Sequence, residues 1–310
     1  MRRADRSDAR ALNDAPAARA AQGTIIASFG RRYLVESDDG LFLECVTRGK
    51  QGGLACGDRV LAVVTSAREG VIEAVDPRRT LLQRAAAHRA KLIAANATQL
   101  AIVVAGEPSF SDELVCRALL AGEHAGMQSL IVLNKADLAA PTQAARARLA
   151  PICASGYRLV EISARHDVSP LRRQLGGETT VLLGQSGMGK STLVNALVPD
   201  ANAETREISR FLDSGKHTTT HSRLYRLDGD TAVIDCPGLQ ELGLAHLDPE
   251  AIELGFPELR GLRGRCRFRD CRHREEPGCA VGEAVAAGSV HPRRLELFHR
   301  IRDAEAAARA

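Results

Sequence analysis

The sequence of 310 residues contains no tryptophan, and aromatic residues make up only 3% of it. No apolar run approaches the roughly twenty residues that a membrane-spanning helix needs. Residues 1–22 lack the apolar segment of a signal peptide and carry several aspartates. We therefore expect a cytoplasmic protein that does not enter a membrane, and we predict that residues 1–22 form a disordered tail.

Lysine is also scarce, with only five among 42 basic residues. Two of the five, Lys135 and Lys190, fall inside motifs, and their rarity strengthens the evidence for those motifs. A net charge of +4 is compatible with RNA binding without demanding it. The 45% hydrophobic content and the length allow two or three domains with buried cores. Disulfides are not expected in a reducing cytoplasm, so clustered cysteines favour a metal site. The five scattered cysteines are predicted to fill core positions: Cys45, Cys56, Cys116, Cys153 and Cys236.

Residues 23–82 contain short segments rich in β-forming residues, separated by turns rich in glycine and aspartate. The expected strands cover residues 24–29, 33–36, 41–46, 59–65 and 70–75. Five short strands in so small a region predict a β-barrel of the OB-fold type. An SH3-like barrel is the alternative, which strand number alone does not separate.

Residues 83–245 alternate apolar runs with helical stretches such as residues 113–125. The apolar runs cover residues 100–104, 129–133, 157–162, 180–183 and 232–234. Continuous apolar runs indicate parallel strands buried on both faces, which predicts a doubly wound α/β domain with ligands at the carboxyl ends of its strands. Residues 246–310 contain a Cys/His cluster and a helical tail over residues 292–310, and they are expected to form a zinc-binding helical module.

A phosphate-binding loop follows the apolar run 180–183 and fits the pattern G-x-x-x-x-G-K-[ST]. Such a loop points backbone N–H groups and a helix N-terminus at phosphate oxygens. We expect Lys190 to contact the β- and γ-phosphates, Ser191 to hold Mg²⁺ through its hydroxyl, and Thr192 to begin the helix. The loop consists of Gly184, Gln185, Ser186, Gly187, Met188, Gly189, Lys190 and Ser191.

The tetrapeptide Asn134-Lys135-Ala136-Asp137 ends the expected strand 129–133 and is predicted to recognise guanine. The carboxylate of Asp137 can accept hydrogen bonds from N1–H and the 2-amino group of guanine. Adenine offers neither donor, so binding it would leave a buried carboxylate unpaired. Ser163 and Ala164 end the next strand, and a backbone N–H there is expected to reach O6 of guanine.

Asp235-Cys236-Pro237-Gly238 follows the apolar run 232–234 and matches a D-x-x-G element. Asp235 is expected to bind Mg²⁺ through water, and the N–H of Gly238 to contact the γ-phosphate. Between the phosphate loop and this element, one threonine of residues 218–220 is predicted to complete the Mg²⁺ shell. We assign this role to Thr219, although the sequence leaves the choice open.

These motifs occur in a permuted order, with the guanine reader before the phosphate loop and D-x-x-G last. A circular permutation preserves such a site because the strands keep their places in the sheet. Leu239 occupies the position where Ras-like enzymes carry the glutamine that orients the attacking water. We therefore hypothesise slow intrinsic hydrolysis of GTP and an external partner that completes the catalytic site.

Cys266, Cys271, His273 and Cys279 stand within fourteen residues and match the Cys₃His ligand set of a structural zinc site. Seven arginines surround them, at Arg260, Arg263, Arg265, Arg267, Arg269, Arg272 and Arg274. They predict phosphate contacts with RNA or reflect an arginine-rich composition on a solvated face. In the barrel, the only candidate platforms for stacking bases are Phe29, Tyr33 and Phe42, so contacts to the RNA backbone or shape are favoured there over base-specific stacking.

These motifs in this order, between a small barrel and a Cys₃His module, resemble the bacterial small ribosomal subunit-dependent GTPases of the RsgA/YjeQ family. The resemblance also includes Gly57-Asp58-Arg59-Val60, Ala95-Asn96 and His217-Thr218-Thr219-Thr220. It implies a GTPase that acts late in assembly of the 30S subunit, with hydrolysis stimulated by the subunit. It further implies that the barrel and the zinc module contact 16S rRNA. We expect a monomer without DNA as a partner.

Two other functions remain open from the sequence. One is a permuted GTPase that serves another RNA particle, such as the large subunit. The other is an RNA-binding adaptor with a vestigial nucleotide site, against which the intact Lys190, Ser191, Asp235 and Asp137 argue. The N-terminal barrel and the position of the cysteine cluster after the GTPase motifs favour the small subunit.

Overall fold

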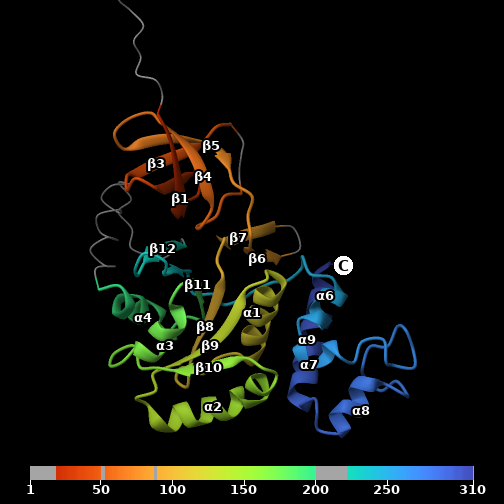
Figure 1. Cartoon of the computed structure of the whole chain (residues 1–310). Helices are drawn as coiled ribbons and strands as arrows, with labels where there is room; N and C mark the ends of the chain where they lie inside the picture. Colours follow the sequence, from red (N-terminus) through yellow and green to blue (C-terminus); the bar gives the residue numbers. More distant parts are fainter. Residues whose placement is uncertain (1–18, 50–52, 87–88, 200–221, 310) are drawn as a thin grey trace, which may run out of the picture.

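The computed structural model describes residues 19–49, 53–86, 89–199 and 222–309. They form a β-barrel, a central α/β domain and a C-terminal helical module that lies beside the α/β domain (Figure 1). Most of the predicted tail and the threonine run 218–220, including Thr219, lie outside the described residues.

The barrel closes through five strands in the order β1-β2-β3-β5-β4, with β4 returning to pair with β1. The pairing of β3 with β5 is parallel and the others are antiparallel, which confirms an OB-like barrel. β1 begins before the expected start of the barrel at Gly23. The strands are β1 (Ala20–Phe29), β2 (Arg32–Ser37), β3 (Phe42–Thr47), β4 (Arg59–Val64) and β5 (Glu69–Val75).

Alternate residues of these strands point into the barrel. They form a core that belongs to the barrel alone and includes Ile25, Leu43, Val60 and Ile72. Tyr33 belongs to this core and is only 4% exposed, so it is not available to stack on a base. Tyr33 is therefore excluded as a stacking platform, because the side-chain period of two in β2 turns it inward. Phe42 points outward and is 50% exposed.

A separate hairpin of β6 (Leu81–Ala86) and β7 (Arg89–Ala95) lies between the barrel and the α/β domain (Figure 1). Gly57 of the barrel lies so close to it that a Cβ there would be 2.0 Å from the carbonyl oxygen of Ala95. The Asn96 side chain donates to the carbonyl of Gly57 at 3.0 Å. Asp58 is fully buried and pairs with Arg78 at 2.7 Å. These contacts hold the barrel against the segment that leads into the α/β domain.

The α/β domain contains strands in the order β10-β9-β8-β11-β13-β12. All pair in parallel except β12, which is antiparallel to β13 and also touches the barrel through the pair Ala27–Arg223. Every residue of β8 is buried, as expected for a strand covered on both faces. The strands are β8 (Gln99–Ala105), β9 (Gln128–Asn134), β10 (Arg158–Glu161), β11 (Thr179–Leu183), β12 (Arg223–Arg226) and β13 (Ala232–Asp235).

The helices of this domain are α1 (Asp112–His124), α2 (Ala139–Ala154), α3 (Ser169–Leu175) and α4 (Lys190–Leu197). α1 begins at an N-cap, where the Ser111 hydroxyl accepts from the N–H of Leu114. Its position confirms the helix predicted over residues 113–125. The doubly wound arrangement places loops from several strands at one edge of the sheet.

The C-terminal module contains α6 (Pro249–Leu254), α7 (Pro257–Arg260), α8 (Ala280–Ala286) and α9 (Pro292–Arg309). Phe298 of α9 packs edge-on against Phe256 with ring centroids 5.4 Å apart. Arg294 is 3% exposed and pairs with Glu258 at 2.6 Å. Arg117 of α1 pairs with Glu305, so α9 is fixed to the α/β domain by a buried charge pair. In the described part of the chain, no helix has the length and apolar character needed to cross a membrane.

Candidate active site

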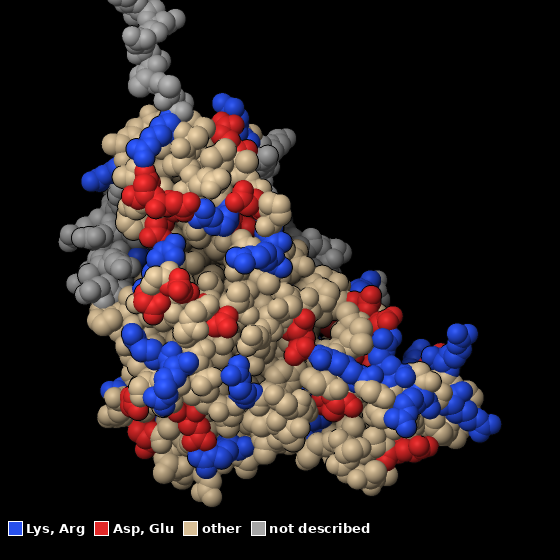
Figure 2. Space-filling view, in the orientation of Figure 1, with Lys and Arg blue, Asp and Glu red and all other residues tan. Residues whose placement is uncertain are grey.

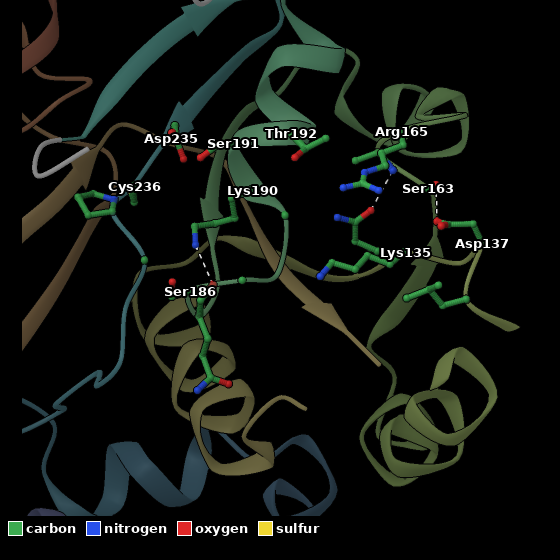
Figure 3. Close-up of a pocket in the computed structure, with 18 residues that line it drawn as sticks. Lys135, Asp137, Ser163, Arg165, Ser186, Lys190, Ser191, Thr192, Asp235 and Cys236 are labelled. Carbon is green, nitrogen blue, oxygen red and sulfur yellow. Dashed lines mark hydrogen bonds between the residues drawn. The ribbon is translucent and has the colours of Figure 1, made fainter. Parts of the chain in front are cut away.

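A cavity of about 540 Å³ lies where loops after β9, β10, β11 and β13 meet (Figure 3). Lys135, Asp137, Ser163 and Arg165 lie at one end, and Lys190, Ser191 and Asp235 lie at the other. Its lining residues are Asn134, Lys135, Asp137, Leu138, Ser163, Ala164, Arg165, Gln185, Ser186, Gly187, Gly189, Lys190, Ser191, Thr192, Asp235, Cys236, Pro237 and Gly238. Motifs scattered from position 134 to position 238 therefore share one pocket.

The phosphate loop connects β11 to α4, and α4 begins at Lys190 rather than at Thr192 as expected. Gly187 and Gly189 have φ angles of 82° and 87°, in the left-handed region that favours glycine. A Cβ on Gly189 would lie 2.5 Å from Nδ2 of Asn134, so a side chain there has no room. The loop therefore wraps the cavity with bare backbone ahead of a helix N-terminus, which is the arrangement that binds anions.

Lys190 is only 8% exposed, and its ammonium donates to the carbonyls of Gly184 at 2.6 Å and Gln185 at 3.1 Å. Burial lowers the pKa of Lys190, and the nearby Asp235 opposes that shift. The ammonium is thus held inside the loop at the end of the cavity opposite Asp137. A bound phosphate would offer it more favourable partners than carbonyls alone.

Asn134 connects three loops at the other end of the cavity. Its Nδ2 donates to the carbonyl of Met188 at 2.9 Å, and its Oδ1 accepts from the N–H of Ala164 at 2.9 Å. Ser163 donates its hydroxyl to Asp137 at 2.6 Å, and this hydrogen bond lowers the pKa of the Asp137 carboxyl. Asp137 is therefore held as a charged acceptor facing the cavity.

Three predicted residues do not line the cavity: Ala136, Gly184 and Met188. Ala136 donates its N–H to the carbonyl of Ile162, and Met188 is buried behind the loop, so they support the site through their backbone. Leu138, Arg165, Cys236 and Pro237 line the cavity without having been assigned to it. Cys236 and Pro237 are the variable positions of the D-x-x-G element, and Leu138 and Arg165 directly follow predicted residues, which is the signal in the sequence that could have identified them.

Leu239 does not face this cavity, which agrees with its inability to orient water. It lines a small apolar cavity with Leu114, Leu183 and Leu242, next to α1. Its N–H donates to the carbonyl of Gly184 at 3.2 Å, which ties the segment after Gly238 to the phosphate loop. Leu239 therefore does not supply the side-chain amide with which the glutamine of Ras-like enzymes orients the attacking water.

The ligand atoms of Cys266, Cys271, His273 and Cys279 all lie within 4.8 Å of one another. Nδ1 of His273 is 3.6 Å from Sγ of Cys266 and 3.5 Å from Sγ of Cys279. A tetrahedral zinc ion with ordinary bond lengths requires nitrogen-to-sulfur separations of about 3.5 Å. The cluster could therefore hold zinc, with Glu253 at 3.7 Å from Nε2 of His273 as an outer partner.

The remaining cysteines occupy the core as predicted: Cys45, Cys56, Cys116 and Cys236 are buried and Cys153 is partly buried.

The arginines near the Cys/His cluster fall into two groups. Arg260, Arg263 and Arg274 form ion pairs with Glu123, Glu250 and Asp303. Arg265, Arg267, Arg269 and Arg272 are exposed and make no ion pair with any described residue. Basic side chains gather over this module in Figure 2.

A family model described as RsgA GTPase matches residues 75–245, which is more than half of the chain. The chain belongs to the RsgA GTPase family. It is 51% identical over 280 residues to a protein of Nitrosospira multiformis, with 90% of each chain covered. It is also 51% identical over 291 residues to one of Burkholderia pseudomallei, covering 91% of this chain and 93% of the relative. Both relatives carry the name "Small ribosomal subunit biogenesis GTPase RsgA".

Solved structures of the family have the same fold. YjeQ from Thermotoga maritima is similar with a TM-score of 0.71 and 27% identity, covering 93% of this chain and 99% of its own. YloQ, described as a circularly permuted GTPase, is similar with a TM-score of 0.68 and 26% identity, covering 96% and 98%. This chain is thus a circularly permuted GTP hydrolase, as the order of its motifs predicted.

Membership of the RsgA GTPase family implies that the protein binds GTP or GDP and Mg²⁺. Asp235 is 7% exposed, and burial raises the pKa of its carboxyl to about 6. A nearby divalent cation favours the charged form of such a carboxyl. Asp235 and Ser191 both line the phosphate end of the cavity, so a carboxylate and a hydroxyl are present there to hold Mg²⁺. When bound, Mg²⁺ neutralises charge on the phosphate oxygens.

Proposed function

We propose that this GTPase hydrolyses GTP to GDP and phosphate while bound to the small ribosomal subunit, at a late step of its maturation in the cytoplasm. The names of its relatives support the subunit as partner. The position of Leu239 carries the rest of the proposal, because the residue directly after Gly238 lines a separate apolar cavity and cannot supply the group that orients water. The subunit supplies or positions that missing group.

In this proposal each end of the cavity has a separate role. Asp137 reads the guanine base, with Ser163 fixing its carboxylate. Ala164, predicted to offer its N–H to O6 of guanine, instead donates it to Asn134 and supports the site through that hydrogen bond. The backbone of Gln185–Gly189 and the ammonium of Lys190 hold the phosphates. Ser191 and Asp235 hold Mg²⁺, while Gly238 contacts the γ-phosphate through its N–H. Thr219, outside the described residues, remains our assignment for the last Mg²⁺ ligand.

The zinc-binding role of the Cys₃His cluster is structural in this proposal, because four protein ligands leave no open coordination position. The module then presents RNA-binding arginines on a rigid frame. Its four unpaired arginines are the best candidates for contacts to 16S rRNA phosphates: Arg265, Arg267, Arg269 and Arg272. We propose that the protein acts as a monomer and that DNA is not a partner.

The test is to measure GTP hydrolysis alone, with 30S subunits and with 50S subunits. We expect slow turnover alone and strong stimulation by 30S only. Stimulation by 50S instead would assign the protein to the large subunit, and tight RNA binding without any hydrolysis would identify an adaptor. Ser191→Ala should abolish Mg²⁺-dependent hydrolysis in each case, because it removes a metal ligand. Fast turnover by the protein alone would contradict the need for a partner.

A further inference from the structure

A second cavity of about 390 Å³ lies next to the nucleotide cavity and shares Cys236, Pro237 and Gly238 with it. Its other walls come from the barrel and from the β6–β7 hairpin that lies between the barrel and the α/β domain (Figure 1). The lining residues are Ser28, Leu54, Ala55, Cys56, Arg84, Lys91, Leu92, Ile93, Ser222, Cys236, Pro237, Gly238 and Leu239. No described role of the nucleotide site uses the hairpin side of this cavity.

Among the described residues that line it, the cavity has two cations and no carboxylate. Arg84 and Lys91 are direct partners across the antiparallel hairpin, so their side chains leave the same face of it. Within the described residues, neither makes an ion pair. Two like charges placed opposite each other destabilise a hairpin unless an anion joins them. This arrangement points to an anionic ligand.

The remaining wall determines which anion fits. Ser28 and Ser222 place hydroxyls on this wall, that of Ser222 donating to Sγ of Cys236 at 3.4 Å, and leucine and isoleucine side chains line the rest. Apolar walls lower the local dielectric and strengthen the attraction of the cations. A phosphate group offers several acceptor oxygens for an arginine, an ammonium and hydroxyls at once. Lys91 is exposed while Arg84 is partly buried, so the cavity opens to the surface at the hairpin.

We propose that this cavity binds a phosphate group of the RNA backbone when the protein engages the small ribosomal subunit, an inference that rests on the proposed function. The shared segment Cys236–Gly238 then lies between the RNA phosphate and the γ-phosphate of GTP. Any change that one phosphate imposes on this segment alters the affinity for the other by the same factor. Binding of the subunit thereby changes the affinity for GTP, and binding of GTP changes the affinity for the subunit.

The first experiment measures acylation of Lys91 in the full-length protein with saturating non-hydrolysable GTP analogue, using mass spectrometry. The chain has only five lysines, so each is readily assigned. We expect labelling of Lys91 to fall about tenfold with 30S subunits at ten times their dissociation constant, and not to fall with inorganic phosphate or pyrophosphate. Protection by inorganic phosphate or pyrophosphate would support a phosphate site but overturn RNA as its source. Protection by none of them would overturn the proposal.

The second experiment compares 30S binding at several salt concentrations for wild type and Arg84→Gln/Lys91→Gln. Loss of one backbone contact should lower the slope of log affinity against log salt by about 0.7 to 0.9. The charge-retaining Arg84→Lys/Lys91→Arg should keep the wild-type slope, and Arg173→Gln on α3 serves as a charge-matched control. An unchanged slope in the double glutamine variant, or an equal loss in the control, would overturn the proposal.

The two failures are distinguishable. If wild-type protein does not bind 30S subunits, the proposed function fails, and protection of Lys91 by inorganic phosphate then shows whether the cavity is a phosphate site without RNA. If wild type binds and is stimulated but the double glutamine variant keeps the wild-type salt slope, only the phosphate cavity fails. Circular dichroism of each variant confirms that it is folded before comparison.

Discussion

The side-chain amide of Asn134 donates to the main-chain carbonyl of Met188 at 2.9 Å, joining the tetrapeptide 134–137, for which we propose guanine binding, to the loop between β11 and α4. The same side chain accepts from Ala164 and is only 1% exposed. One buried amide therefore sets the spacing between the base-binding and phosphate-binding ends of the cavity.

Replacing Asn134 by alanine should weaken nucleotide binding without unfolding the domain. It removes two hydrogen bonds and leaves a buried carbonyl and N–H unpaired, at about 1–3 kcal/mol each. We expect GDP affinity to fall about 10- to 100-fold, measured by isothermal titration calorimetry. The exposed Asn195 on α4 offers a matched control, since Asn195→Ala should bind GDP as wild type does. Equal affinities in both variants would show that the loops need no such connection.

Asp137→Asn should change the preferred base. The new amide presents a donor toward the 2-amino group of guanine, which is itself a donor, whereas xanthine carries an oxygen there. Because unpaired buried polar groups dominate such discrimination, we expect GDP affinity to fall at least about 100-fold and xanthosine diphosphate to bind better than GDP. Calorimetry with the two diphosphates measures this. Unchanged preference for GDP would remove Asp137 from the base-binding role.

Asp235→Asn should stabilise the protein without nucleotide and Mg²⁺, while abolishing hydrolysis. Burial raises the pKa of Asp235 to about 6 from an ordinary 3.8, so the folded state binds this proton more tightly than the unfolded state. Stability is therefore lost as pH rises toward 6 and stays low above it. We expect the variant to gain about 1–3 kcal/mol at pH 7.5 and less at pH 5.

Thermal unfolding in chelator at the two pH values measures this effect. Asp230 lies in an exposed turn, so Asp230→Asn should change stability by no more than about 0.5 kcal/mol. A lower melting temperature for Asp235→Asn at pH 7.5 would show that the carboxylate stabilises the empty site, contrary to its burial.

Glu253→Gln should weaken zinc binding because Glu253 lies 3.7 Å from Nε2 of His273 and orients that ring. Loss of such an outer partner typically lowers metal affinity by about 10- to 100-fold. Competition with a chromophoric chelator measures it. Glu250→Gln, on the same helix but 64% exposed and paired with Arg263, should retain zinc as wild type does. Equal zinc affinity in the two variants would argue against Glu253 as a partner of the site.

The local backbone geometry of the motifs was predictable because it depends on residues adjacent in sequence. The phosphate loop needs glycines at Gly187 and Gly189 and a lysine directly after, and the structure shows both glycines in the left-handed region. Helix boundaries were less predictable, since α4 begins at Lys190 while Thr192 was expected. The backbone conformation of Gly189 at the N-cap determines that α4 begins at Lys190, and the helix preferences of the residues do not predict this boundary.

Charge pairing could not be predicted. Arg260 and Arg265 are alike in the sequence, yet Arg260 pairs with Glu123 of α1 and Arg265 makes no ion pair within the described ranges. Likewise, the inward direction of Tyr33 follows from the register of β2 in a closed barrel. Arg84 and Lys91 become a cationic pair only through the hairpin register.

The sequence by itself determined the permuted order of the GTPase motifs, the chemical groups of the nucleotide site and the Cys₃His donor set, because each is written in short local patterns. Only the tertiary structure decided that Asn134 joins the loops, that Leu239 does not line the cavity between them, and that Arg84 and Lys91 line a second cavity. The physical reason is that burial, side-chain direction and electrostatic pairing arise from contacts between residues far apart in the chain, which local patterns do not encode.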